Sequence, residues 1–213
     1  MAKIPFGVLG PFFGKVGPVS GYKWKEISVM RSLRGKSNKP PTEAQLQQRE
    51  KFGFTSKFLK GISDLIKIGF GELAIGKTEY QCAMSYNLDN AVSGKRPDFK
   101  LHYDKVAVSR GSLPNAVFPE VKAGDNASEL RFIWADNSGI GLAAATDHAI
   151  AAVYCPAVKR WTFRQAPDAK RADCSALLVV PAFSGQTVHT WLTFVSEAGK
   201  ASDSVYTGEI VVK

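Results

Sequence analysis

Apolar and polar side chains alternate along much of the chain after Asp98. Leu130, Phe132 and Trp134 occupy every second position. A two-residue period places such side chains on one face of a β-strand. The same alternation predicts strands at 99–103, 106–108, 149–155, 161–163, 176–180, 188–195 and 205–212.

Turn-forming residues separate these strands. They occur at 124–126, 136–139, 184–185 and 198–200 and are rich in Gly, Asp, Asn and Ser. About seven short strands in roughly 115 residues are typical of an immunoglobulin-like or fibronectin-like antiparallel β-sandwich. The chain lacks the Cys-Trp-Cys spacing of antibody domains, which argues against a true antibody-type domain.

Between residues 42 and 92 the apolar spacing becomes helical. Thr42 and Gln45 match a capping box, and they follow two prolines that stop the preceding segment. Apolar residues then recur at helical spacing to Ile66, with weak points at Gly53 and Gly61. A second helix is predicted from about 78 to 92. We expect two helices, packed as a hairpin or against the sheet, and a linker at 93–97.

Residues 6–34 carry glycine at short intervals, which favours extended strands with tight turns. Tyr22 and Trp24 alternate with two lysines, and Ile27 and Val29 continue the apolar positions. This pattern predicts a Gly-rich β-arm or hairpin whose core is too small for independent stability. The predicted fold class is therefore α+β. We divide it into residues 1–97, a basic β-arm plus helical region, and residues 98–213, an immunoglobulin-like β-sandwich.

Positive charge is concentrated at the start of the chain. The formal net charge is +9, and the first sixty residues carry twelve Lys and Arg against three acidic residues. The remaining 153 residues carry sixteen of each. Such asymmetry predicts contact with an anionic partner or with another copy of the protein.

Two interpretations of this segment stay open. In the first, its apolar face docks onto the chain's own sandwich or onto a neighbouring copy, through Tyr22, Trp24, Ile27 and Val29. In the second, its cations hold the phosphate backbone of a nucleic acid, and the best placed are Arg31, Arg34, Lys36, Lys39 and Arg49. We favour docking, because short alternating strands that need a sheet edge commonly join subunits.

One motif suggests nucleotide chemistry. Residues 71–78 match the phosphate-loop pattern G-x-x-x-x-G-K-T. Such a loop should follow a buried parallel strand, whereas this one follows an amphipathic helical stretch, and Glu72 would repel phosphates. We therefore interpret the segment as a helix-to-helix turn with Thr78 as the N-cap.

No catalytic residue, metal site or cofactor is predicted. The histidines His102, His148 and His189 lack metal-binding spacing, and no G-x-S-x-G nucleophile motif occurs. The cysteines Cys82, Cys155 and Cys174 form no C-x-x-C pair, so neither a disulfide framework nor a zinc site is indicated. A single bridge from Cys155 to Cys174 is compatible with an exported chain.

The chain is expected to be a folded, soluble protein with no membrane span. Its apolar start at 4–13 is interrupted by Pro and Gly, which argues against a secretion signal. No apolar run approaches the roughly 20 residues that cross a bilayer. A cytoplasmic or particle-associated location is favoured.

Several motifs together resemble an uncharacterised domain-of-unknown-function family of small proteins frequent in Bacteroidota. The resemblance covers essentially the whole chain. It rests on Gly14-Lys15-Val16-Gly17, Trp24-Lys25, Arg31-Ser32, Asn38, Pro40, Gln45, Arg49, Phe52, Gly69-Phe70, Ala83-Met84-Ser85-Tyr86-Asn87, Pro97-Asp98-Phe99, Val108-Ser109-Arg110-Gly111, Trp134, Asp136-Asn137, Phe194-Val195-Ser196-Glu197, Tyr206 and Gly208. It implies no reaction, cofactor or catalytic residue, and it marks Gly71 and Gly76 as incidental.

These observations predict a non-enzymatic structural or assembly protein. Its N-terminal arm would mediate self-association or docking in a filament, a surface array or a phage-derived particle. By analogy, an arm joined to a plain sandwich suggests assembly more than catalysis. The alternative is a nucleic-acid-binding protein that uses the basic N-terminal segment.

Overall fold

The computed structural model describes residues 3–4, 10–33, 35 and 39–213, with the backbone alone for residues 164–168. The chain divides into two compact units, Met1–Thr42 and Glu43–Lys213. Helices and several antiparallel sheets make up the fold, which confirms the mixed α+β class. The domain boundary predicted at residue 97 falls inside a hairpin of the second unit.

The first unit contains a three-stranded antiparallel sheet, called the N-terminal sheet below. Its strands are consecutive and lie in the order β1-β2-β3: β1 (Gly14–Val16), β2 (Val19–Trp24) and β3 (Ile27–Ser32). Gly17 has a φ of 55° in the first tight turn, a left-handed conformation that glycine adopts without steric cost. Lys25 takes up φ 50° in the second turn.

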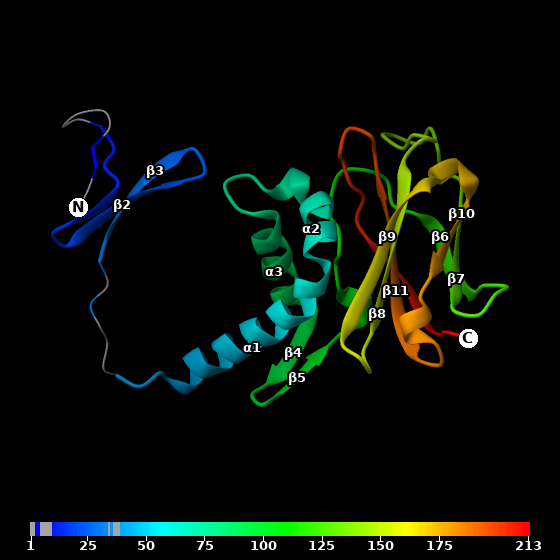
Figure 1. Cartoon of the computed structure of the whole chain (residues 1–213), viewed down its shortest axis with the longest axis horizontal. Coiled ribbons are helices and arrows are strands. Elements are labelled where there is room, and N and C mark those ends of the chain that lie inside the picture. Colours follow the sequence, from blue (N-terminus) through cyan, green and yellow to red (C-terminus); the bar gives the residue numbers. More distant parts are fainter. Residues whose placement is uncertain (1–2, 5–9, 34, 36–38) are drawn as a thin grey trace. The chain divides into compact units, whose positions relative to one another are not determined.

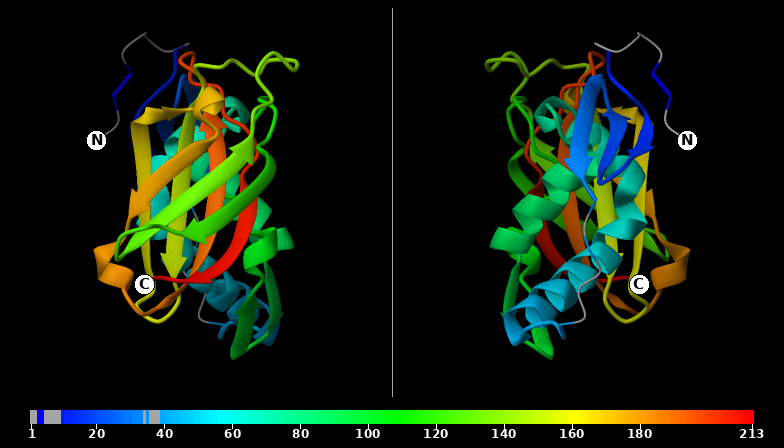
Figure 2. Two further views of the ribbon diagram at one scale, coloured as in Figure 1. Left: turned by 90° about the vertical axis from the view of Figure 1, so that its right-hand side faces the viewer. Right: turned by 90° about the vertical axis from the view of Figure 1, so that its left-hand side faces the viewer.

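The second unit contains two larger antiparallel sheets (Figures 1 and 2). One has the order β10-β7-β6 and the other has the order β12-β11-β8-β9. Their bounds are β6 (Val117–Ala123), β7 (Glu129–Ala135), β8 (His148–Cys155), β9 (Arg160–Lys170), β10 (Ser175–Val179), β11 (Thr187–Val195) and β12 (Val205–Val211).

The two sheets share one hydrophobic core. Trp134 of β7 and Phe194 of β11 meet edge to face, with ring centroids 5.4 Å apart. Leu130, Val153 and Leu192 are fully buried in the same cluster. The alternating residues of each strand therefore close the space between the sheets, as the two-residue period requires.

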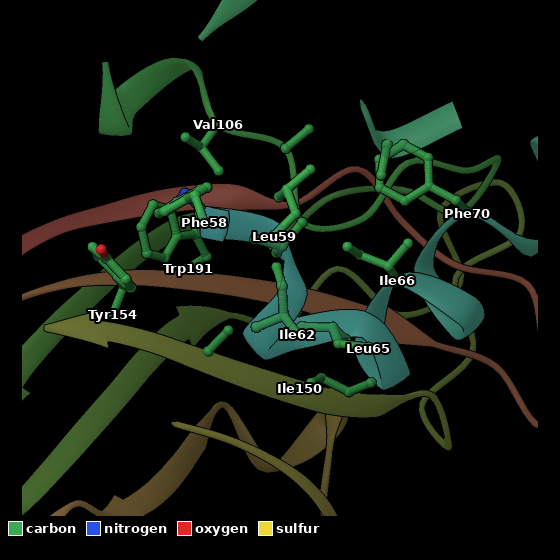
Figure 3. Packing of buried hydrophobic residues seen from close by; sticks show 14 of the residues in the cluster. Phe58, Leu59, Ile62, Leu65, Ile66, Phe70, Val106, Ile150, Tyr154 and Trp191 are labelled. Atoms are coloured by element: carbon green, nitrogen blue, oxygen red, sulfur yellow. The ribbon is translucent and has the colours of Figure 1, made fainter. Parts of the chain in front are cut away.

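Helices cover the other face of the four-stranded sheet (Figure 1). They are α1 (Glu43–Leu59), α2 (Ser63–Gly69) and α3 (Glu79–Asn90). Figure 3 shows Phe58, Leu59 and Ile62 packed against the sheet residues Ile150 and Trp191. Both faces of β8 and β11 are thus covered, which explains why nearly every residue of these strands is buried.

The first predicted helix is divided in the structure. Lys60–Ile62 form a 3₁₀ helix between α1 and α2, at the weak point predicted at Gly61, whereas Gly53 lies within α1. A Cβ on Gly61 would lie 2.8 Å from Cδ1 of Trp161. Trp161 also donates from Nε1 to the carbonyl oxygen of Phe58 at 2.8 Å. The break therefore lets the helices approach β9 closely.

The linker predicted at 93–97 is wrong. These residues belong to a hairpin formed by β4 (Val92–Lys95) and β5 (Asp98–Leu101), with a cis peptide bond at Arg96–Pro97. Arg96 donates to the carboxylates of Glu50 and Glu43 on α1 at 2.6 and 3.3 Å. The turn residues that suggested a linker are therefore held against a helix.

The strand predicted at 106–108 is also absent from this described segment. Residues Tyr103–Lys105 form a 3₁₀ helix, and the segment after it is buried under the helices without a strand partner. Side chains satisfy its backbone instead. Asn87 bonds both the N–H and the carbonyl of Ala107, and the Ser204 hydroxyl accepts from the N–H of Val108 at 3.0 Å.

The sequence pattern missed β6. Pro119 interrupts this strand, and a proline argues against a central strand. In the structure β6 is an edge strand, with a register irregularity between Val117 and Glu120 and a φ of 48° at Phe118. A bulged edge accommodates the proline because that position needs no ladder N–H.

Candidate functional site

The structure brings the four predicted docking residues together on one face of the N-terminal sheet. Tyr22 lies directly opposite Val29, and Trp24 lies opposite Ile27. Cross-strand partners share a face, so these residues form the apolar patch that the alternation predicts. Tyr22, Trp24 and Ile27 expose 38%, 40% and 60% of their surface. Arg31 joins this face, and its guanidinium lies 5.5 Å from the Tyr22 ring centroid.

The N-terminal sheet has almost no core of its own. Gly21 is the only buried residue among those described in the first unit. An added Cβ there would collide with the carbonyl oxygen of Phe12, which covers the opposite face. Three strands can be stable by themselves only when they bury a hydrophobic face, and this sheet buries too little apolar surface to offset the entropy of ordering its residues.

The predicted phosphate-binding cations are only partly placed. Arg31 lies on β3, and Lys39 is exposed after it. Arg34 and Lys36 lie outside the described residues. Arg49 lies on α1 in the second unit, exposed near Phe52. A shared phosphate site of these five residues stays a prediction.

The phosphate-loop match is a turn between helices, as predicted. Residues Gly71–Leu73 form a 3₁₀ helix directly after α2, and Thr78 caps α3. The Thr78 hydroxyl accepts from the N–H of Gln81 at 3.2 Å, and the Gln81 side chain accepts from the N–H of Thr78 at 3.0 Å. This reciprocal capping box satisfies two backbone donors at the helix start.

Glu72 in this turn has a structural partner. Its carboxylate accepts from the N–H and hydroxyl of Ser112 at 2.9 and 2.7 Å, and from the N–H of Ala201 at 3.4 Å. Burial opposes ionisation, but these hydrogen bonds outweigh it and lower the pKa of Glu72. The carboxylate therefore ties the helical layer to two loops of the sandwich.

A second site is a cleft of about 340 Å³ that the sequence pattern did not reveal. Its described lining comes from α1, β5, the 3₁₀ helix at 103–105, β8 and the turn after β8. The lining residues are Phe54, Lys57, Phe58, Leu101, Tyr103, Tyr154, Pro156 and Lys159. We call this the aromatic cleft.

Three aromatic rings converge in the aromatic cleft. Phe58 meets Tyr154 edge to face at 4.8 Å between ring centroids, and Tyr103 lies 5.9 Å from Tyr154. Behind them Tyr103 stacks on His189 at 3.7 Å, with the planes 17° apart. Figure 3 shows the hydroxyl end of Tyr154 directed away from the helical core. The cleft therefore combines rigid apolar surface with polar tips.

The ionisation of these groups follows from burial. Burial raises the pKa of Tyr103, and it raises the pKa of Tyr154 to about 12. Burial also lowers the pKa of His189, although the Glu209 carboxylate acts against this. The His189 Nδ1 atom shares a hydrogen bond of 2.8 Å with the Tyr206 hydroxyl. At neutral pH both tyrosine hydroxyls are protonated and can donate hydrogen bonds.

The described part of the chain contains no assembled metal site and no disulfide bond. No group of three or more His, Cys, Asp or Glu residues there is placed to hold a metal ion. The three cysteines are free, and Cys155 is buried between the sheets. None of the helices in the described ranges is long and apolar enough to cross a membrane.

Local sequence patterns account for only one of the two sites. The apolar face of the N-terminal sheet follows from alternation within a dozen residues. The aromatic cleft draws on residues that lie about a hundred positions apart, between Phe54 and Lys159.

A comparison with curated proteins finds no match. A family model matches residues 11–208, and the chain therefore belongs to DUF6266, a family of unknown function.

Proposed function

We propose that this protein is a non-enzymatic assembly protein whose N-terminal sheet docks onto a second copy of the chain. The observation that carries the proposal is the exposed apolar face of Tyr22, Trp24, Ile27 and Val29 on a sheet without a core. Burying that face would supply the stabilisation that the sheet lacks. The glycine-rich strands would then act as the predicted arm.

The free edge of the sheet supports pairing with another strand. β3 pairs only with β2 among the described strands, so its outer edge presents unpaired backbone groups. β3 has few of the features that keep natural edge strands from pairing with another chain. It contains neither Pro nor Lys, and its one charged residue is Arg31. An antiparallel contact between two β3 edges would extend the apolar face across six strands.

The symmetry of the contact would decide the assembly. A self-complementary contact between two N-terminal sheets closes at a dimer, whereas docking of the sheet onto a neighbour's sandwich continues into a filament, array or particle shell. We favour a second copy as the partner because most soluble oligomers consist of identical chains.

We also propose that the sandwich belongs to the immunoglobulin-like or fibronectin-like class. In seven-stranded immunoglobulin domains the first, second, fourth and fifth strands form one sheet, and the third, sixth and seventh strands form the other. Counting from β6, the orders β6-β7-β10 and β12-β11-β8-β9 follow this scheme except for the fourth strand, which lies beside the third. Such sandwiches are common in cell-surface modules, which suits a structural role.

The test measures the molar mass of the full-length protein by light scattering after size exclusion, over a range of concentrations. We expect an oligomer, and we expect the Trp24→Ser/Ile27→Thr variant to be monomeric. Met30→Thr is the matched control, because Met30 is 67% exposed, pairs with Gly21 and lies on the opposite face of the same strand. A full-length protein that stays monomeric at every concentration would overturn the proposal.

The second candidate is nucleic-acid binding by the same segment. Residues 1–42 carry eight Lys and Arg and a single acid, Glu26. The contact of Arg31 with the exposed Tyr22 ring resembles the pairing of cation and aromatic surface that stacks on unpaired bases. The test titrates single-stranded DNA and RNA at several salt concentrations. Affinity should fall steeply with salt and weaken in Arg31→Ala/Lys39→Ala, whereas absent binding at low salt rejects this candidate.

A further inference from the structure

We propose that the aromatic cleft of the second unit binds a small molecule composed of an aromatic ring and a carboxylate. Three features of the cleft point to this ligand class: its ring-lined walls, its two lysines and its free hydroxyl donors. The site is independent of the N-terminal sheet. It would remain if the assembly proposed for that sheet were disproved.

The shape of the cleft suits one aromatic molecule. Its volume of about 340 Å³ lies at the lower end of the range of roughly 300–1,000 Å³ that is usual for small-molecule sites. Phe58 and Tyr154 are 7% and 8% exposed, and their rings are held by packing against Trp161, at centroid distances of 5.0 Å from each. A planar ligand would therefore meet preorganised rings.

The charge of the lining favours an anion. Lys57 projects from α1, and Lys159 comes from the turn between β8 and β9, so two separate elements bring cations to one cleft. Neither lysine forms an ion pair with any residue that the structure describes, and no acidic residue is among the described lining. This charge also makes the N-terminal sheet, with its own excess of cations, a poor occupant.

Two tyrosine hydroxyl groups in the cleft would orient the carboxylate of the ligand by donating hydrogen bonds to it. The Tyr103 and Tyr154 hydroxyls have no hydrogen-bond partner among the residues that the structure covers, whereas the Tyr80 and Tyr206 hydroxyls are bonded. Because burial raises the pKa of both Tyr103 and Tyr154, they keep their protons at neutral pH. Charge-assisted hydrogen bonds from such donors to a carboxylate are stronger than neutral ones.

The first experiment compares three ligands on the full-length protein by calorimetry and by NMR of the Trp161 indole N–H. The ligands are 1-naphthylacetate, its neutral amide, and cyclohexylacetate, which keeps the charge but lacks the aromatic ring. Since Trp161 contacts two of the cleft rings, its signal should shift when the cleft fills. We expect 1-naphthylacetate to bind about tenfold more tightly than either comparison ligand.

The second experiment tests the residues. Lys57→Gln and Lys159→Gln should each weaken 1-naphthylacetate about three- to tenfold, and Tyr154→Phe should weaken it by a similar factor while keeping the ring. Lys122→Gln, on β6 of the second unit and paired with Glu120, is the matched control and should leave the affinity unchanged. The proposal is overturned if 1-naphthylacetate does not bind, if the amide binds equally well, or if neither cleft lysine matters.

Discussion

Side chains alternate between the two faces of the N-terminal sheet and of the four-stranded sheet, but the two sheets differ in what covers their apolar residues. Trp24 is 40% exposed on the N-terminal sheet, whereas Trp191 on β11 is fully buried between that strand and the helices. Both tryptophans belong to antiparallel strands with regular partners. The difference shows that alternation identifies the apolar face of a strand, while only neighbouring layers decide whether that face stabilises the fold.

The strongest test of this comparison replaces each tryptophan by alanine. Trp191→Ala should lower the free energy of unfolding of the second unit by about 3–5 kcal/mol, because it leaves a cavity among closely packed rings. Trp24→Ala should change that transition by less than about 0.5 kcal/mol. Urea unfolding followed by circular dichroism measures both. Similar losses for the two variants would contradict the comparison.

Breaking a buried ion pair should likewise cost far more stability than breaking an exposed one. The Arg171 guanidinium bonds Asp147 at 3.0 Å and Asn137 at 2.7 Å in the interior of the second unit. Asp147→Ala leaves this cation unpaired and should cost about 3–5 kcal/mol, while Glu26→Ala breaks an exposed pair with Lys23 and should leave the melting temperature unchanged.

A double variant serves as the control for this prediction. Asp147→Leu/Arg171→Met removes both charges and should recover much of the lost stability, since apolar side chains can replace a buried pair at little cost. If it is as unstable as Asp147→Ala in urea unfolding, the loss comes from packing or from the other Arg171 contacts instead.

Two glycines of the helical layer give a smaller effect of opposite sign. Gly61→Ala places a methyl 2.8 Å from Trp161 and should destabilise the second unit by about 1–3 kcal/mol. Gly53→Ala, within α1, meets open space and should stabilise it by about 0.5–1 kcal/mol. Thermal unfolding of both variants checks the signs. A stabilising Gly61→Ala would show that the helices do not need this close approach to β9.

The smallest expected effect is a pH dependence confined to the second unit. Burial in the folded state lowers the pKa of His189 below its ordinary value of 6.5. As the pH falls, the His189 imidazole is therefore protonated in the unfolded chain before it is protonated in the folded chain. Stability from this group is complete above pH 6.5 and decreases as the pH falls through the lowered pKa. His189→Phe should flatten the curve of unfolding free energy against pH between pH 7 and 5.

Self-association provides the comparison for this pH effect. Residues 1–42 contain no histidine, so contacts made by the N-terminal sheet should keep the same concentration dependence from pH 7 to 6. Light scattering across this range measures it. A marked change in molar mass would place a histidine of the second unit at the contact.

Short-range patterns predicted much of this molecule. The strands at 130–134, 149–155, 176–180, 188–195 and 205–212 occur where alternation places them, within a few residues. The capping residue Thr78 and the weak point at Gly61 also follow from local chemistry. The errors at β6, at the 93–97 hairpin and at 106–108 arose where an edge position or a side-chain partner outweighed local preference.

The sequence by itself determined the α+β class, the family and the apolar face of the N-terminal sheet, because each depends on residues close together along the chain or on the pattern as a whole. Tertiary structure alone decided that β8 and β11 are covered on both faces and that Lys57, Tyr103, Tyr154 and Lys159 meet in one cleft. The physical reason is that periodicity specifies the direction of a side chain relative to its own strand or helix. Convergence of distant side chains depends instead on how layers pack, and no local period encodes it.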